Sequence, residues 1–169
     1  MVASTYTDFQ RSRALYVFAY RRGADSGVSF TPAALGAGGP VYVYNYFKGA
    51  GMVADGAAAF EDSLDGDRAY YIVAPIGPSG IAFLGDAGHF VTLGKKRIVQ
   101  LNDSGAVEAT IAFAKGEDSR TLFGYSPSAP LVTAGVGAVA ATSYDEDTHL
   151  FRLTVTPDAG GTAVIAIGF

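Results

Sequence analysis

The stretch Val107–Ala114 reads VEATIAFA, and its side chains alternate between two kinds. Its odd-numbered residues are valine, alanine, isoleucine and phenylalanine, whereas a glutamate and a threonine lie among the even-numbered ones. Because successive side chains of a strand point to opposite faces, this alternation predicts a strand that buries one face only. A helix would bring its apolar residues back about every 3.6 positions, which is not the pattern here.

Runs rich in branched and aromatic residues recur on both sides of this strand at the spacing typical of sandwiches and barrels. They are Arg13–Tyr20, Val41–Phe47, Tyr70–Pro75, Ile81–Leu84, Ile98–Asn102, Arg120–Tyr125, Leu131–Val139, Leu150–Thr156 and Ala163–Phe169. The dipeptide Asp65-Gly66 predicts a tight hairpin that joins Phe60–Leu64 to Tyr70–Val73. Glycine or proline interrupts every longer stretch that has helical periodicity. We therefore predict an all-β fold, an antiparallel β-sandwich of Greek-key or jelly-roll type, with little or no helix.

The size of the chain fits one domain. It has 169 residues, of which 49% are hydrophobic and 17% are charged, and this composition supports a buried core and excludes intrinsic disorder. We predict a single sandwich domain over residues 1–169. Residues 1–25 then form an extra edge strand or a remnant of an upstream segment. The 22 glycines indicate many tight turns.

Charge and cysteine content exclude several functions. A net charge of −4 argues against nucleic acid as a partner, because such binders neutralise phosphates with lysine and arginine. The chain has no cysteine, so it has no thiol nucleophile, disulfide or cysteine-based zinc site. We find no signal peptide in Met1–Gln10 and no apolar run of membrane-spanning length, and we expect no membrane partner. The compartment stays open, since the parent protein of an exported domain would carry its signal elsewhere.

One polar pair is a candidate site. His89 follows Asp86 by three residues in the sequence Gly85-Asp86-Ala87-Gly88-His89. The carboxylate can orient the imidazole as an acid–base pair, or share a metal ion with it. A third ligand at suitable spacing is lacking, so we predict no metal and no cofactor. The alternative is a structural histidine at the surface.

Three tyrosines form a second candidate. Tyr42, Tyr44 and Tyr46 share one face of the run Val41–Phe47. A row of tyrosine rings can stack on sugars, because each ring offers a flat apolar face and a hydroxyl group. The alternative is that tyrosine is simply a good strand former whose hydroxyl reaches water at the rim of the sheet. The chain has no tryptophan, which weighs against a dedicated sugar-binding platform.

The segment Tyr70–Asp86 (YYIVAPIGPSGIAFLGD), followed by Leu93–Ile98 (LGKKRI), resembles the C-terminal β-sandwich region of large α-galactosidase-like glycoside hydrolases of the raffinose-synthase group. Val41–Phe47 and Tyr144–Phe169 fit the same resemblance, which covers roughly residues 40–169. In that group the catalytic carboxylates lie in a separate (β/α)₈ barrel, for which this chain is too short. The resemblance thus implies no catalytic residue here, and a domain that packs against a barrel.

These observations lead to three hypotheses. The first is a non-catalytic accessory domain of a carbohydrate-active enzyme, whose partner is the catalytic domain, in cis or as a separate chain. It predicts a broad exposed apolar patch and no deep polar pocket. The second is a carbohydrate-binding module, which predicts exposed rings at Tyr42, Tyr44 and Tyr46. The third is a small independent hydrolase, which predicts Asp86 and His89 together in a cleft.

Overall fold

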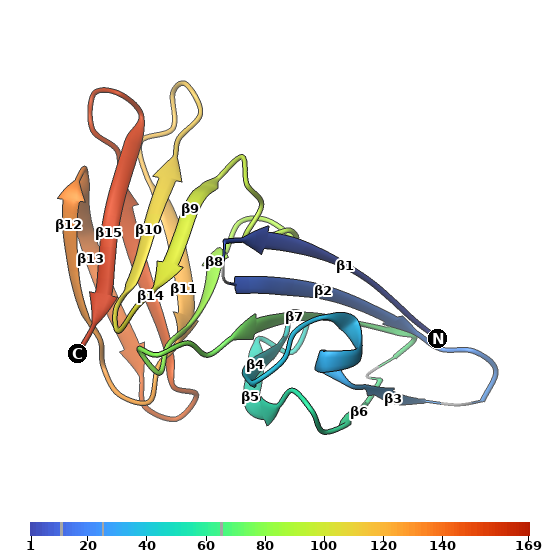
Figure 1. Ribbon diagram of the computed structural model, residues 1–169. Coiled ribbons are helices and arrows are strands. Elements are labelled where there is room, and N and C mark those ends of the chain that lie inside the picture. Colours follow the sequence, from blue (N-terminus) through green and yellow to red (C-terminus); the bar gives the residue numbers. More distant parts are fainter. Residues whose placement is uncertain (11, 25, 65) are drawn as a thin grey trace. The chain divides into compact units, whose positions relative to one another are not determined.

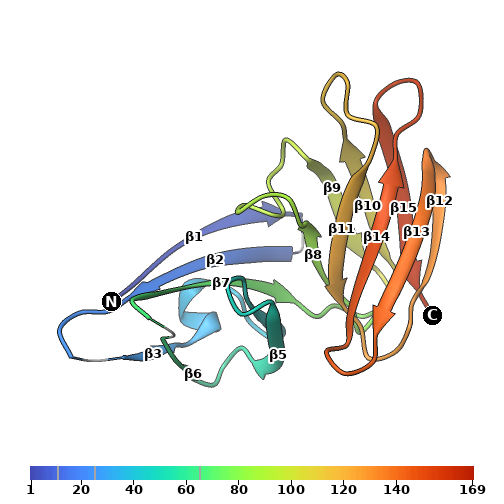
Figure 2. The same cartoon turned by 180° about the vertical axis from the view of Figure 1, so that it is seen from behind.

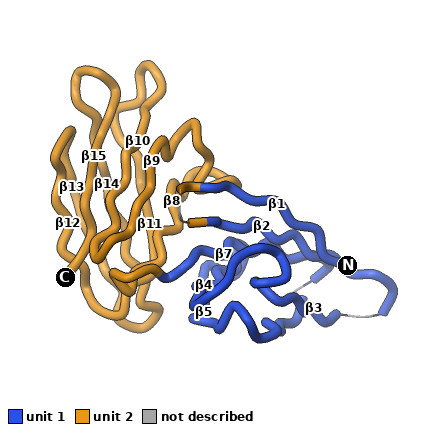
Figure 3. The backbone as a smooth tube through the Cα atoms, in the orientation of Figure 1, with its two compact units in different colours: residues 1–8, 13–76 blue, residues 9–12, 77–169 orange. Residues whose placement is uncertain are grey.

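The computed structural model describes residues 1–10, 12–24, 26–64 and 66–169. The all-β prediction is confirmed: these residues form antiparallel strands and, as their one helical element, the short 3₁₀ turn Pro32–Leu35 (Figure 1). In this part of the chain, no helix has the length and apolarity that a membrane crossing needs. The chain forms two compact units (Figure 3). Unit 1 comprises Met1–Asp8 and Arg13–Ile76, unit 2 comprises Phe9–Ser12 and Gly77–Phe169, and the single domain over residues 1–169 stays a prediction.

Unit 1 is built on a sheet with the strand order β1-β2-β7-β4-β5. These strands are β1 (Val2–Phe9), β2 (Ser12–Tyr20), β7 (Arg68–Pro75), β4 (Pro40–Asn45) and β5 (Ala50–Asp55). A separate ribbon pairs β3 (Gly27–Phe30) with β6 (Phe60–Ser63). The predicted hairpin between Phe60–Leu64 and Tyr70–Val73 is therefore wrong, since β6 pairs with β3 whereas β7 lies between β2 and β4. Asp65 of its predicted turn lies outside the described residues.

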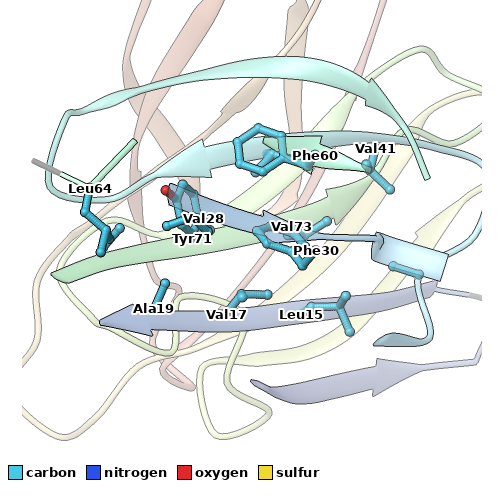
Figure 4. Close-up of a cluster of buried hydrophobic side chains, with 13 residues drawn as sticks. Leu15, Val17, Ala19, Val28, Phe30, Val41, Phe60, Leu64, Tyr71 and Val73 are labelled. Atoms are coloured by element: carbon cyan, nitrogen blue, oxygen red, sulfur yellow. The ribbon is translucent and has the colours of Figure 1, made fainter. Parts of the chain in front are cut away.

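The core of unit 1 lies between one face of this sheet and the β3–β6 ribbon (Figure 4). Alternate residues of β2, β4 and β7 point into it, as their period of two requires. Three rings meet at its centre: Phe30 lies 5.1 Å from Phe60 and 5.6 Å from Tyr71, measured between centroids. The buried cluster comprises Leu15, Val17, Ala19, Val28, Phe30, Ala37, Val41, Val43, Phe60, Leu64, Ala69, Tyr71 and Val73.

A carboxylate ties the ribbon to this core. Asp62 of β6 accepts a hydrogen bond from the buried hydroxyl of Tyr71 at 2.9 Å and pairs with Lys48 Nζ, also at 2.9 Å. Burial opposes ionisation of Asp62, but the hydrogen bonds from Lys48 and Tyr71 outweigh it, and the pKa of this carboxyl lies below its ordinary value. The charged form is therefore the one that stabilises unit 1.

We expect this contribution to depend on pH. A carboxyl whose pKa is lower in the folded state adds stability above its unfolded pKa of about 4, and loses it as the pH falls through the lower folded value. Unfolding of unit 1 in urea at pH 7 and pH 3 measures the effect. The wild type should lose more stability between the two pH values than Asp62→Asn, which carries no charge at either. An equal loss in both proteins would contradict the assignment.

Unit 2 is the β-sandwich, and its two layers are seen in Figure 2. One sheet has the order β12-β15-β10-β9 and the other the order β13-β14-β11-β8. The strands are β8 (Ala82–Asp86), β9 (Ile98–Asp103), β10 (Val107–Ala112), β11 (Arg120–Tyr125), β12 (Leu131–Val136), β13 (Ala138–Asp145), β14 (Leu150–Thr156) and β15 (Thr162–Gly168). The chain changes sheets between β8 and β9, between β10 and β11, between β11 and β12, between β12 and β13, and between β14 and β15.

The inner faces of the sandwich follow the alternation in the sequence. Val107, Ala109 and Ile111 are buried, and so are Phe151, Leu153 and Val155, as their period of two predicts. The single strand expected over Leu131–Val139 is wrong, because it is two strands in different sheets. Gly137 separates them with a φ of +71°, a conformation that favours glycine and lets the chain pass from one sheet to the other.

Candidate functional site

The three tyrosines proposed as a sugar platform do not form one. Tyr42 and Tyr44 lie in β4 with only 1% and 6% of their surface exposed. Tyr42 also lies so close to Gly51 of β5 that a Cβ atom there would be 2.6 Å from its ring. Tyr46 alone is half-buried, with its ring centroid 5.6 Å from that of Tyr70. The prediction of an exposed row is wrong, because β4 is a central strand buried on both faces.

Exposed rings lie instead on β2 and just beyond β4. Phe18, Tyr20 and Phe47 are 41%, 37% and 48% exposed, and the guanidinium of Arg68 lies 5.6 Å from the centre of the Phe47 ring. We call these four residues the aromatic patch. A shallow hollow of about 490 Å³ is lined by Phe18, Tyr20 and Arg68 together with Asp67 and others. The patch offers stacking surfaces next to charged side chains, which sequence reasoning missed because it looked along one strand only.

Asp86 and His89 do lie together. His89 Nδ1 is 3.1 Å from Asp86 Oδ2, but the same oxygen lies 3.1 Å from Arg97 Nε. The other carboxylate oxygen of Asp86 accepts the backbone N–H of Gly88 at 2.9 Å. Asp86 is 1% exposed, whereas the side chain of His89 is 49% exposed. Asp86 Oδ2 lies at ion-pair distance from both side chains but forms no hydrogen bond with them, and it is shielded from solvent. A substrate therefore has no access to this carboxylate, as a general base would require.

Arg97 extends this pair into a charged network. Its guanidinium forms two hydrogen bonds with Glu117, at 2.6 and 2.9 Å, and Glu117 in turn pairs with Arg120. Asp86 belongs to β8 and Arg120 to β11 of one sheet, whereas Arg97 directly precedes β9 of the other. The network therefore joins the two sheets of unit 2. Its geometry is that of a structural ion-pair cluster. The spacing of Asp86 and His89 in the sequence indicates one contact of this cluster, but not the contacts with Arg97, Glu117 and Arg120.

The second histidine, His149, also forms a hydrogen bond within the protein. Tyr144 Oη lies 3.1 Å from the carbonyl oxygen of Ser126 and 2.7 Å from His149 Nδ1. A tyrosine hydroxyl has one proton, which the carbonyl must accept, so the Nδ1–H of His149 donates to Tyr144. His149 has a φ of +56°, which non-glycine residues adopt infrequently. These contacts close the hairpin between β13 and β14.

The most unusual surface of unit 2 is formed by β12 and β13, which are the edge strands of the two sheets and lie side by side (Figure 1). We call residues 131–143 the β12–β13 edge. Within it Val132 and Val139 are partly buried, and every other residue is exposed. Leu131 is 70% exposed and Val136 is 37% exposed. The sequence between Arg120 and Asp145 contains no charged residue, so this edge presents apolar and small polar side chains only.

Comparison with known proteins does not identify the chain. No protein-family model matches it, and no curated protein matches it at a significant level. Among the described residues, no group of three or more histidine, cysteine, aspartate or glutamate side chains is arranged to hold a metal ion.

Proposed function

We propose that this chain is a non-catalytic accessory β domain that docks on a separate protein domain through the β12–β13 edge. The resemblance of Tyr70–Asp86 and Leu93–Ile98 to the α-galactosidase-like hydrolases makes the catalytic barrel of a carbohydrate-active enzyme the partner of choice. In this role the chain stabilises the catalytic domain and performs no chemistry of its own.

One observation carries the proposal: neither face of the two edge strands is buried. A strand in a sandwich ordinarily buries one face, as β14 and β15 do with their alternating burial. By contrast, β12 and β13 expose both odd-numbered and even-numbered residues along their whole length, so side chains on both faces reach the surface. An edge of this kind, without lysine or proline to discourage pairing, is normally covered by another protein surface.

The composition of the edge suits a permanent rather than a transient contact. Burying apolar surface stabilises association by about 25 cal/mol for each Å² removed from water. Obligate interfaces are more apolar and poorer in charge than transient ones. An uncharged edge of valine, alanine, threonine and glycine therefore fits a domain held on its enzyme throughout its life. It fits poorly with a chain that meets its partner briefly.

Site-specific photo-crosslinking tests the proposal, because it captures whichever protein lies against the edge. A photoreactive phenylalanine analogue at position 136, in cells of the source organism, should crosslink to a peptide of a (β/α)₈ catalytic domain, identified by mass spectrometry. The same analogue in place of Lys115, an exposed residue outside the edge, is the matched control and should give no such product. Adding Leu131→Asp should lower the yield at position 136 at least tenfold, because it places a charge in the interface.

Two results would contradict the docking role. One is the absence of any crosslink from position 136 to another domain while the variant is folded and abundant. The other is a crosslink only to a second copy of the same chain, which would make the edge a dimer interface instead.

A further inference from the structure

A second surface of unit 2 is hollowed and polar. The outer face of the sheet at β9, β10 and β15 bears a groove of about 680 Å³, within the range of small-molecule sites. The side chains that line it include Gln100 and Asn102 of β9, Glu108 and Thr110 of β10, and Val164 of β15. We call this the β9–β10 groove. It uses none of the residues of the β12–β13 edge, and the inference drawn from it does not depend on the docking proposal.

The register of the sheet places the four polar side chains in a compact array. Asn102 lies directly opposite Glu108, and Gln100 lies directly opposite Thr110. Residues two apart on a strand share a face, so all four project from the same side of the sheet. Cross-strand neighbours have Cβ atoms about 5 Å apart, and residues two apart along a strand are separated by about 7 Å. On the far side of β10, Val164 is paired with Thr110 and adds an apolar surface.

These side chains retain their capacity to bind a ligand. In the described part of the chain, no hydrogen bond or ion pair from the protein engages the side chains of Gln100, Asn102, Glu108 or Thr110. Three of them are exposed and Thr110 is half-buried, so a ligand can reach them. Elsewhere in unit 2 polar side chains are used internally, as Asp103 is by Ser79 at 2.6 Å. The groove therefore differs from the structural networks of the same sandwich.

The chemistry of the lining excludes most ligand classes. Glu108 is the one carboxylate that lines the described groove, too few for a cation site. Lys95 is the one cation among the lining residues that the structure describes, and Glu108 lines the same groove. Together with the net charge of −4 of the chain, this disfavours a phosphate-rich ligand. Seven of the twelve described residues that line the groove are polar or charged, which disfavours a purely apolar ligand.

These side chains suit a neutral ligand that carries many hydrogen-bond donors and acceptors close to one another. The amides of Gln100 and Asn102 both donate and accept, the carboxylate of Glu108 accepts, and the hydroxyl of Thr110 does either. Adjacent hydroxyl groups of a sugar ring can pair with such planar side chains two at a time. We propose that the β9–β10 groove binds an oligosaccharide through Gln100, Asn102, Glu108 and Thr110, with Val164 against the C–H face of a ring.

Titration calorimetry with the full chain tests this. The probes are neutral gluco-, galacto-, manno- and xylo-oligosaccharides, with oligogalacturonate as the anionic arm. We expect one neutral series to bind, and Asn102→Ala or Glu108→Ala to weaken that binding at least tenfold. Thr162→Ala is the matched control: Thr162 lies on the same outer face, opposite Ala112, but outside both the groove and the β12–β13 edge, and the affinity of this variant should equal that of the wild type. All three substituted side chains reach the surface of the protein, so circular dichroism should show that each variant is folded.

Three results would overturn the proposal. The first is that no oligosaccharide of the panel binds the folded chain. The second is that only oligogalacturonate binds, and that Glu108→Ala strengthens it. The third is that binding survives both groove variants and is lost in Tyr20→Ala, which would assign sugar recognition to the aromatic patch of unit 1. Amide chemical shifts of β9 and β10, recorded during the titration, locate the ligand independently.

Discussion

Replacing Asp86 with alanine is expected to lower the free energy of unfolding of unit 2 by about 3 kcal/mol, because removing one partner of a buried ion pair leaves the other charge uncompensated. Asp86 is 1% exposed, and the side chain of its partner Arg97 is 13% exposed. Glu117 then faces both Arg97 and Arg120 alone, so the network acquires a net positive charge between the two sheets. Asp86→Asn should cost less than Asp86→Ala, since an amide oxygen can still accept the N–H of Gly88.

His89→Ala is the matched control, and it separates the structural interpretation from the catalytic one. The His89 side chain is half-exposed, so its pair with Asp86 is worth less than about 1 kcal/mol in stability. Urea unfolding followed by the amide signals of β10 reports on unit 2, and those of β4 report on unit 1. If His89→Ala costs as much as Asp86→Ala, then the Arg97 network is not what Asp86 serves.

The strands that the sequence predicted correctly are mostly those with at least one buried face. Val107–Ala112 and Leu150–Thr156 alternate because the sandwich core covers one side of each. Ala50–Asp55 was missed for the opposite reason: it is an edge strand, mostly exposed on both faces, so nothing imposes alternation on it. Strand pairing is a further limit on prediction from sequence. The dipeptide Asp65-Gly66 indicates a turn, but it does not indicate which distant strands pair with β7.

In the candidate sites, too, contacts between residues near in sequence could be anticipated, whereas contacts between residues far apart in sequence could not. The spacing of Asp86 and His89 offered their contact as one of two alternatives, and the two side chains lie 3.1 Å apart. Arg97 and Glu117, which decide the role of Asp86, come from other strands and connections, and no local pattern links them to it. For Tyr42 and Tyr44 the shared face followed from the period of two, but whether that face is covered depends on tertiary structure.

Substitution of Gly85, the residue before Asp86, is expected to lower the free energy of unfolding of unit 2 by a similar amount. Gly85 in β8 has a φ of +91°, and a Cβ atom there would collide with the carbonyl oxygen of Thr92. That oxygen cannot withdraw freely, because it accepts the N–H of Asp86 at 2.9 Å. Gly85→Ala should therefore destabilise unit 2 by about 3–4 kcal/mol, the sum of the left-handed conformation and the overpacking.

Gly80→Ala isolates the first of these two costs. Gly80 has a φ of +75°, but a Cβ atom there would meet nothing within 4 Å. Its replacement should cost about 1–2 kcal/mol, from backbone conformation alone. The same urea unfolding measures both variants, and equal costs would show that the space around Gly85 adjusts to a methyl group. Because Gly85 positions Asp86, the double variant Gly85→Ala/Asp86→Ala should cost less than the two single variants added together. Strict additivity would mean that Gly85 does not hold Asp86 in the network.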